Sequence, residues 1–274
     1  MICAMNRTGI EVSADVLDPD EPDAAAIVNP LGRSPLLLIG DHGGRRVPRA
    51  LAQLGLSDAD LARHIGWDIG VTALGLALAQ ALDATFIHQI YSRLVIDCNR
   101  DPAAVDAMSA VSDGTVVPGN AALTPAAQAA RVTAIHAPYH AAIAAEIARR
   151  TAASQPTALV ALHSFTPVMR GQARPWHCGI LHDGANDALA RAMLAALKEE
   201  EDLLAGDNAP YAMDGIDYTV PRHAFSARLP YVEIEIRQDL LADNAGVAVW
   251  AARWARLLSA ASNAAAPEGG GESA

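Results

Sequence analysis

The chain contains almost no lysine and no dense basic cluster. Lys198 is its single lysine, and the formal net charge is −11. Binding along a nucleic-acid backbone requires concentrated lysine and arginine side chains. The composition therefore argues against nucleic acid as a partner, and we expect a small-molecule substrate instead.

Cysteine and long apolar runs are scarce as well. The three cysteines, Cys3, Cys98 and Cys178, are widely separated and form no CxxC pair, which argues against a cysteine-based zinc site or a disulfide framework. No apolar run approaches the roughly 20 residues of a membrane helix, and the N-terminus does not have the pattern of a signal peptide. We expect a cytoplasmic protein without a membrane partner; the sequence does not set its oligomeric state.

Hydrophobic residues make up 51% of the 274 positions, enough for one large core, with two domains as the alternative. Strand-like and helix-like segments alternate, which predicts an α/β fold with a mixed, mainly parallel sheet and helices on both faces. We expect a flexible N-terminal segment (1–27), one domain (28–262) and a disordered tail (263–274). Strands are predicted at 36–40, 84–89, 93–98, 158–162, 177–181 and 231–236, and helices at 71–82, 125–151, 184–200 and 243–261.

Residues 36–48, LLLIGDHGGRRVP, join an apolar strand to a polar turn. In open α/β sheets, ligands bind at the carboxyl ends of strands. Glycines allow a sharp turn and a close approach of the backbone to a ligand. His42 is therefore a candidate site residue, and a turn with a solvent-exposed histidine is the alternative.

A second histidine, His163, follows the apolar strand 158–162. Two histidines at strand ends, with a carboxylate elsewhere, suit a catalytic zinc site that keeps one position for water. Zinc lowers the pKa of such a water, and a nearby glutamate can act as general base. Arg93 and Arg100 could hold a substrate carboxylate through paired hydrogen bonds.

Glu233 and Glu235 lie two residues apart in the strand YVEIEI, so their side chains share one face. Two carboxylates are costly to bury unless arginine, metal or water compensates them. The alternative is an edge strand whose polar face is open to solvent.

Six motifs together resemble the N-formylglutamate amidohydrolase family. They are DHGGRRVP (41–48), WDIG (67–70), SRLVIDCNR (92–100), APYH (137–140), ALHSF (161–165) and YVEIEIRQ (231–238). The resemblance covers roughly residues 35–260, and the combination of SRLVIDCNR with ALHSF is its most specific part. The first motif is more similar to the branch of the family with DH at the first strand end than to the branch with PHSG.

The family is similar in plan to zinc carboxypeptidases and aspartoacylases. This resemblance implies a three-layer, zinc-exopeptidase-like (phosphorylase/hydrolase-like) sandwich and a site that binds zinc or another divalent metal. It implies His42 and His163 as ligands, and Asn99 beside Arg100 at the substrate carboxylate. It also implies Glu235 as the general base.

The family's position matching Glu233 is often glutamine, so Glu233 is expected to support the substrate. Zinc carboxypeptidases and aspartoacylases have a glutamate three residues after the first histidine, where this chain has Arg45. Asp68 is our candidate for the third metal ligand, and a helix N-cap is its alternative role.

Other polar residues near these motifs receive weaker assignments. His140, four residues after His136 on a predicted helix, is assigned to the substrate pocket or to packing, and His136 to the surface. Arg170, on the loop after His163, could contact a substrate carboxylate or lie in solvent. His223 is expected to be a loop histidine.

The expected activity is hydrolysis of the amide of a small N-acylated amino acid, N-formylglutamate-like, to formate and glutamate. Arg93, Asn99 and Arg100 would anchor the amino-acid carboxylate. One alternative is a metallopeptidase or deacylase of the same fold that acts on a larger acidic substrate. The other is a non-catalytic small-molecule-binding protein that has lost the metal. This alternative stays open because Arg45 stands where the related enzymes have a glutamate.

Overall fold

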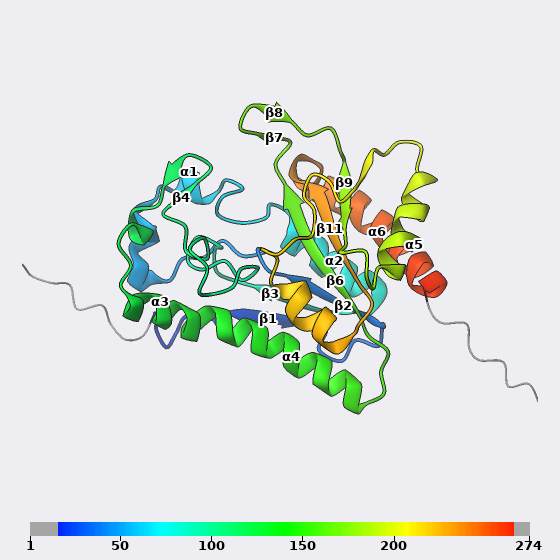
Figure 1. Ribbon diagram of the computed structural model, residues 1–274, viewed down its shortest axis with the longest axis horizontal. Coiled ribbons are helices and arrows are strands. Elements are labelled where there is room, and N and C mark those ends of the chain that lie inside the picture. The colour runs from blue at the N-terminus through cyan, green and yellow to red at the C-terminus, as the bar shows by residue number, and fades with distance from the viewer. Residues whose placement is uncertain (1–15, 266–274) are drawn as a thin grey trace, which may run out of the picture.

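A seven-stranded sheet organises residues 16–265, the part of the chain that the computed structural model describes (Figure 1). The strand order is β1-β3-β2-β6-β11-β9-β10. The bounds are Ala25–Val28 (β1), Leu36–Gly40 (β2), Thr85–Gln89 (β3), Ala158–Phe165 (β6), Cys178–Leu181 (β9), Ala205–Asp207 (β10) and Tyr231–Arg237 (β11). The four central strands β3, β2, β6 and β11 pair in parallel, whereas β1 pairs antiparallel with β3 and β9 antiparallel with β11. The predicted mixed, mainly parallel sheet is confirmed.

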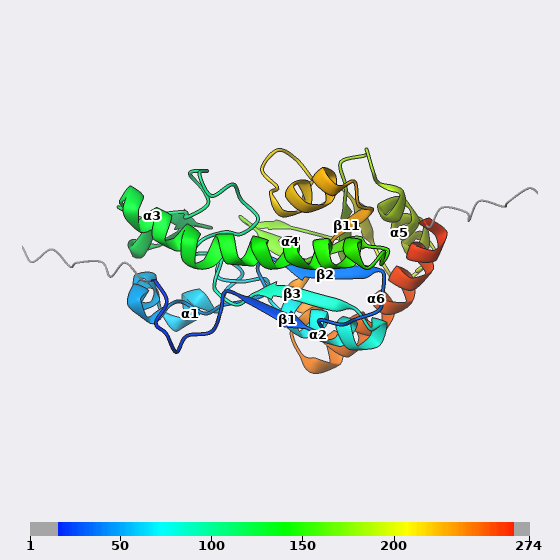
Figure 2. The same ribbon diagram turned by 90° about the horizontal axis from the view of Figure 1, so that it is seen from below.

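Helices cover both faces of the sheet, which makes the fold a three-layer sandwich (Figure 2). One face carries α2 (Val71–Leu82), α5 (Ala188–Lys198) and α6 (Asn244–Ala265). The other carries α4 (Ala137–Ala152), which continues from α3 (Pro125–Arg131) through a π-helical turn, η3 (Val132–His136). Alternate residues of β2 serve the two layers: Leu36 and Leu38 pack toward α2, and Leu37 and Ile39 pack toward α4. The apolar run of β2 is therefore buried on both sides, as parallel strands require.

Residues 93–98 form turns, so the strand predicted there is wrong. Backbone bonds within the segment are local: Val95 N donates to Ser92 O, and Arg100 N donates to Asp97 O. Its apolar side chains, Val95 among them, enter the core on the α4 side of the sheet. A short apolar run signals burial, and burial is equally available to a turn that lies over the sheet.

Two of the segments that connect the main helices and strands contain short hairpins. Residues 101–124 contain β4 (Val111–Ser112), β5 (Thr115–Val116) and a 3-10 turn, η2 (Pro118–Asn120). Residues 165–176 contain β7 (Val168–Met169) and β8 (Gln172–Ala173). The short helix α1 (Asp58–Leu61) begins at Ser57, which forms a complete capping box with Asp60. Further short turns are η1 (Arg49–Gly55), η4 (Pro221–Phe225) and η5 (Gln238–Leu241).

The predicted flexible segment 1–27 needs correction where it overlaps the described residues. β1 begins at Ala25 and pairs with β3 from that residue onward. The hydroxyl of Tyr91 donates to Pro22 O, and Arg49 forms an ion pair with Asp18, so residues before β1 are also held by contacts. Residues 1–15 and the tail 266–274 lie outside the described range. No helix within 16–265 combines the length and apolarity needed to cross a membrane.

Candidate functional site

The turn after β2 places Asp41 and His42 at the carboxyl end of the parallel strands. The backbone N–H of Asp68 donates to His42 O at 2.8 Å, which joins this turn to the approach to α2. A Cβ added to Gly44 would lie 2.0 Å from the carbonyl of Ile90, so only glycine permits this close backbone contact. His42 is buried, and the alternative of a solvent-exposed turn histidine is wrong.

Three side chains from distant segments converge here. Asp68 Oδ2 lies 3.5 Å from His42 Nδ1 and 3.0 Å from His163 Nδ1. His42, Asp68 and His163 can each offer a ligand atom such that the three atoms lie within 4.8 Å of one another, so the structure contains a possible metal site. The helix-capping alternative for Asp68 is wrong, because the N-cap of α2 is Gly70 and no side chain caps it.

A carboxylate lies behind the outer nitrogen of each histidine. His42 Nε2 lies 2.7 Å from Asp97 Oδ1, and His163 Nε2 lies 3.4 Å from Asp41 Oδ2. Metal-binding histidines usually donate their second ring N–H to such an acceptor, which leaves the other nitrogen for the metal. His42 Nδ1 has no hydrogen-bond partner among the described residues and is buried. This donor set and its geometry fit a divalent metal.

The charges around the two histidines favour their protonated forms when no metal is bound. Burial and Arg93 lower the pKa of His42, but Asp97 and Asp68 outweigh them and raise it above its usual value. Burial also lowers the pKa of His163, whereas Asp41 and Asp68 raise it well above the usual range. A bound cation would replace these protons, so metal binding at this site would release them.

Two buried glutamates face the same site from β11. Glu235 is paired with His163 of β6 in the strand register, and Glu233 is paired with Ala161. The Oε2 atoms of both glutamates are buried without a hydrogen-bond partner. Because burial dominates, the pKa of each carboxyl is raised to about 8. β11 lies between β6 and β9, so the alternative of a solvent-facing edge strand is wrong.

These groups line one inner cavity of about 240 Å³. The possible metal ligands, both glutamates and the three residues predicted to anchor the substrate, Arg93, Asn99 and Arg100, all lie on its wall. The remaining lining residues are Ser164, Leu181, Tyr211, Ala212, Asp214, Ile216 and Asp217. The structure thus brings together eight of the ten residues that the sequence assigned to the site, and places His140 and Arg170 elsewhere.

The polar groups of Arg93, Asn99 and Arg100, the three predicted anchoring residues, already form contacts within the protein. Arg93 makes a two-pronged ion pair with Asp97, with Nη2 at 2.7 Å. Asn99 accepts from two backbone N–H groups, at 218 and 219, and donates to Asp217, so it also holds the loop that covers the cavity. Arg100 donates to Asp106 and to the backbone O of Asn99.

His140 lies behind the site and does not line the inner cavity. Its Nε2 donates to Cys98 O, so its Nδ1 accepts from His223 Nε2. Burial lowers the pKa of His140 to about 3, which keeps the ring neutral. The expected substrate contact is therefore corrected to a packing and hydrogen-bonding role. His136, expected at the surface, is buried and contacts Arg100 O, and His223, expected in a loop, is buried in η4.

Arg45, where the resemblance to zinc carboxypeptidases and aspartoacylases led us to expect a glutamate, lies outside the possible metal site. It is exposed, and its guanidinium lies 5.3 Å from the ring centre of Trp67. Asp68, the next residue, turns into the site instead. The carboxylate of the possible metal site is therefore that of Asp68, at the approach to α2.

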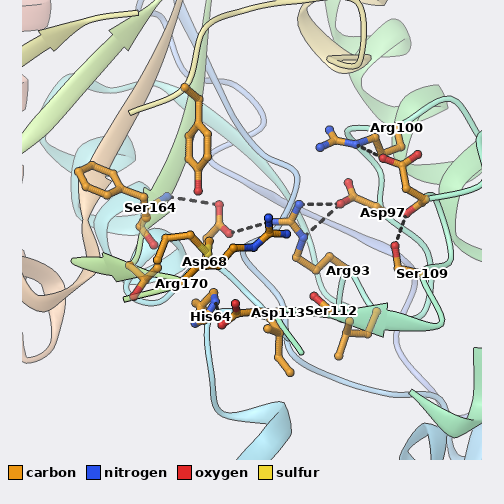
Figure 3. Close-up of a pocket in the computed structure, with 17 residues that line it drawn as sticks. His64, Asp68, Arg93, Asp97, Arg100, Ser109, Ser112, Asp113, Ser164 and Arg170 are labelled. Atoms are coloured by element: carbon orange, nitrogen blue, oxygen red, sulfur yellow. Dashed lines mark hydrogen bonds and ion pairs between the residues drawn. The ribbon is translucent and has the colours of Figure 1, made fainter. Parts of the chain in front are cut away.

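A second cavity of about 250 Å³, named the outer cavity, shares part of its wall with the first (Figure 3). Five residues line both cavities: Asp68, Arg93, Arg100, Ser164 and Tyr211. Arg170, on the turn between β7 and β8, lines the outer cavity only. His64 and Asp113 also line it and lie beside each other, with 3.3 Å between His64 Nε2 and Asp113 Oδ2.

Sequence reasoning did not assign roles to Asp41, Asp97 or Asp217. Asp97 had a usable signal, because it is the acid of SRLVIDCNR and stands between two residues assigned to the site. Asp41 also had one, as the neighbour of His42. Asp217 lies in a turn-rich segment whose sequence carries no such signal; only the fold brings it to Asn99.

Comparison with known proteins gives a consistent match. The family model described as N-formylglutamate amidohydrolase matches residues 34–242. A crystal structure of a gene product from Agrobacterium tumefaciens is 36% identical, with a TM-score of 0.87 over 90% of this chain and 98% of that chain. A structure solved as N-formylglutamate amidohydrolase from Ralstonia eutropha is 21% identical, with a TM-score of 0.62 over 89% of this chain and 98% of that chain, and shares the fold. No curated protein sequence matches the chain.

Proposed function

Since the chain belongs to the N-formylglutamate amidohydrolase family, whose members are hydrolases acting on amide bonds, we propose that it cleaves the amide of a small N-acylated acidic amino acid. N-formylglutamate is the reference substrate, and formate and glutamate are its products. The proposal includes dependence on zinc or another divalent metal.

One observation carries this proposal. Two histidine nitrogens and the Asp68 carboxylate converge on one point in a cavity whose wall also contains two buried glutamates and two arginines. Packing alone does not account for so many charged groups, because each is costly to remove from water. A metal, a water molecule and an anionic substrate together would satisfy them.

His42, Asp68 and His163 would hold the metal, with Asp97 and Asp41 orienting the two histidines. When bound, a divalent ion would polarise the substrate carbonyl, lower the pKa of a bound water and bring down the raised pKa of Glu235, so that this carboxyl is ionised and can act as a base. The chain's own residues supply the remaining work of binding and proton transfer.

Glu235 is assigned the proton transfer because its strand position is paired with that of His163. Water adds its oxygen to the acyl carbon, the C–N bond breaks, and the nitrogen leaves with a proton that Glu235 has taken from the water. Glu233, one pleat further from the strand end, is assigned to hydrogen-bonding the substrate. Arg93 and Arg100 are assigned to the amino-acid carboxylate, with paired N–H groups that lysine could not replace.

The test is hydrolysis of a panel of N-formyl and N-acetyl amino acids by the purified protein, with and without a chelator, together with its metal content. We expect about one metal equivalent, activity that is highest toward acidic N-formyl substrates, and loss of activity with the chelator. A well-folded protein without metal or activity would instead support the non-catalytic binding protein.

A further inference from the structure

We propose that the outer cavity is a second substrate subsite that binds a carboxylate beyond the glutamate-like unit. The substrate class is then an N-acylated acidic dipeptide with a free terminal carboxylate. This inference rests on the proposed amidohydrolase function and specifies its substrate.

The first argument is continuity and size. Arg93 and Arg100 belong to the wall of both cavities, so the two spaces form one cleft. Ligand sites typically enclose roughly 300–1,000 Å³. Each cavity alone, at about 240 and 250 Å³, is smaller than this range, whereas the joined cleft falls within it. A ligand that fills the cleft therefore extends past the two arginines.

The second argument is charge. Four acids line the outer cavity, and each already has a cationic partner: Arg93 pairs with both Asp68 and Asp97, Arg100 with Asp106, and Arg63 with Asp113. Arg170 also lines this cavity, and within residues 16–265 it has no hydrogen-bond or ion-pair partner. Among the arginines that line this cavity, Arg170 is therefore the one whose charge no acid of the described chain offsets.

The lining of the outer cavity also contains neutral polar groups. His64 Nε2 is buried without a hydrogen-bond partner in the described chain, although Asp113 lies nearby. Burial lowers the pKa of His64, which favours its neutral form. Ser112 and Thr166 add hydroxyl groups to the lining. An anion held by Arg170 would find further hydrogen-bonding groups in this cavity (Figure 3).

The position of the arginines sets which end of the substrate extends outward. His163 and Glu235 lie on the inner cavity only, so the scissile carbonyl belongs there. Arg93 and Arg100, assigned to the amino-acid side, form the passage to the outer cavity. The amino-acid side of the substrate is therefore the one that continues toward Arg170, and the acyl group stays inside.

The decisive measurement is the ratio of kcat/KM for N-formyl-glutamyl-glutamate to kcat/KM for N-formylglutamate. A charge-assisted contact to Arg170 should make this ratio about 10 or more in the wild type. We expect Arg170→Ala to bring the ratio close to 1, Arg170→Glu to bring it below 1, and Arg170→Lys to restore part of it. Arg33→Ala is the matched control, since Arg33 is an exposed arginine paired with Asp83 outside the cleft. A ratio that does not respond to any Arg170 variant would overturn the outer subsite.

Binding of the two amine products separates this inference from the proposed function. Calorimetry on the metal-containing protein should show tighter binding of glutamyl-glutamate than of glutamate, and Arg170→Ala should remove the difference. If neither formyl compound is cleaved, the proposed function fails, yet this difference still decides the outer subsite. Equal binding of both products by the wild type would disprove it.

Discussion

His42 and His163 approach each other edge to face, with ring centres 5.0 Å apart and an interplanar angle of 65°. They reach this contact from the ends of β2 and β6, which are adjacent and parallel. The Nδ1 atoms of both rings face Asp68 Oδ2. One cation bound to this carboxylate could therefore contact both rings.

Removing one of the two histidines should abolish stoichiometric metal binding. Each protein is loaded with a slight excess of zinc and then dialysed. We expect the wild type to retain about one equivalent of zinc per chain and His163→Ala to retain far less than half an equivalent. Elemental analysis of the dialysed proteins measures this directly. His177→Ala serves as the control, because His177 lies at the start of β9 outside both cavities. Equal zinc on wild type and His163→Ala would remove His163 from the metal site.

Asp41 should tune the metal affinity without contacting the metal. Its Oδ1 accepts from Tyr139 and Thr219, and its Oδ2 faces His163 Nε2. Carboxylates in this position typically contribute 10–100-fold to metal affinity, so Asp41→Asn should weaken zinc binding by about that factor. Competition with a chromogenic chelator gives the affinity.

The matched control for Asp41 is Asp207→Asn. Asp207 forms a similar carboxylate–histidine pair, with its Oδ1 2.8 Å from His182 Nε2. It lies on β10, an edge strand of the sheet. We expect no change in zinc affinity for this variant. If both variants weaken zinc binding by the same factor, the lower affinity of Asp41→Asn results from a general loss of structure and not from the contact with His163.

Glu235, rather than Glu233, should be the general base. Loss of a general base typically lowers the rate about 10²–10⁴-fold. We expect Glu235→Gln to lose this much kcat while it retains metal, and Glu233→Gln to lose far less. Steady-state kinetics on metal-loaded proteins decides between them, and the reverse ranking would show that the two roles are exchanged.

Arg100→Lys should weaken substrate binding while the fold is retained. Lysine keeps the charge but cannot make a paired contact with a carboxylate. We expect KM for N-formylglutamate to rise about tenfold or more, with a thermal unfolding midpoint close to that of the wild type. Arg191→Lys, on α5 and outside the cleft, should leave KM unchanged. An unaltered KM for Arg100→Lys would exclude Arg100 from the carboxylate contact.

Glu146 should contribute stability that depends on pH. It pairs with Arg149 and with Arg150, whose side chain is fully buried. Burial raises the pKa of Glu146, but the hydrogen bonds from these arginines outweigh it, and the net pKa is below the usual 4.5. A carboxyl with a depressed pKa stabilises the fold above its unfolded-state pKa, and this contribution is lost as the pH falls through the folded-state value.

We therefore expect Glu146→Gln to lower the free energy of unfolding by about 1–3 kcal/mol at pH 7. The difference from wild type should shrink as the pH is lowered below 4.5, where the wild-type carboxyl begins to be protonated. Urea unfolding at a series of pH values measures it. A difference that stays constant with pH would show that the charge of Glu146 is not responsible.

Much of the fold could be predicted because the relevant signals are local. The strand at 36–40 and the helix at 71–82 were predicted with the bounds that the structure has. The Ser57 capping box depends on residues three apart, and Thr124 caps α3 by accepting a hydrogen bond from the backbone N–H of Ala127. Such signals require only chain geometry within one turn.

The site was harder to predict because its geometry depends on contacts between distant segments. Residues 93–98 form turns because Asp97 faces His42 and Arg93 rather than a strand neighbour. His140 was misplaced for the same reason: its partner His223 is far away in sequence. Spacing along the chain can select residue types for a metal site, but it does not tell which histidine faces the cavity.

The central place of β6 also determines when the site can form during folding. β6 pairs in parallel with β2, which precedes it by more than one hundred residues, and with β11, which follows much later. Parallel pairings between distant segments form slowly, because a long loop must close before any contact stabilises it. We expect metal binding and activity to return in the last phase of refolding, after most helical signal has recovered. A chain that stops before β11 would contain His42, Asp68 and His163 but would lack the strand that completes the cavity.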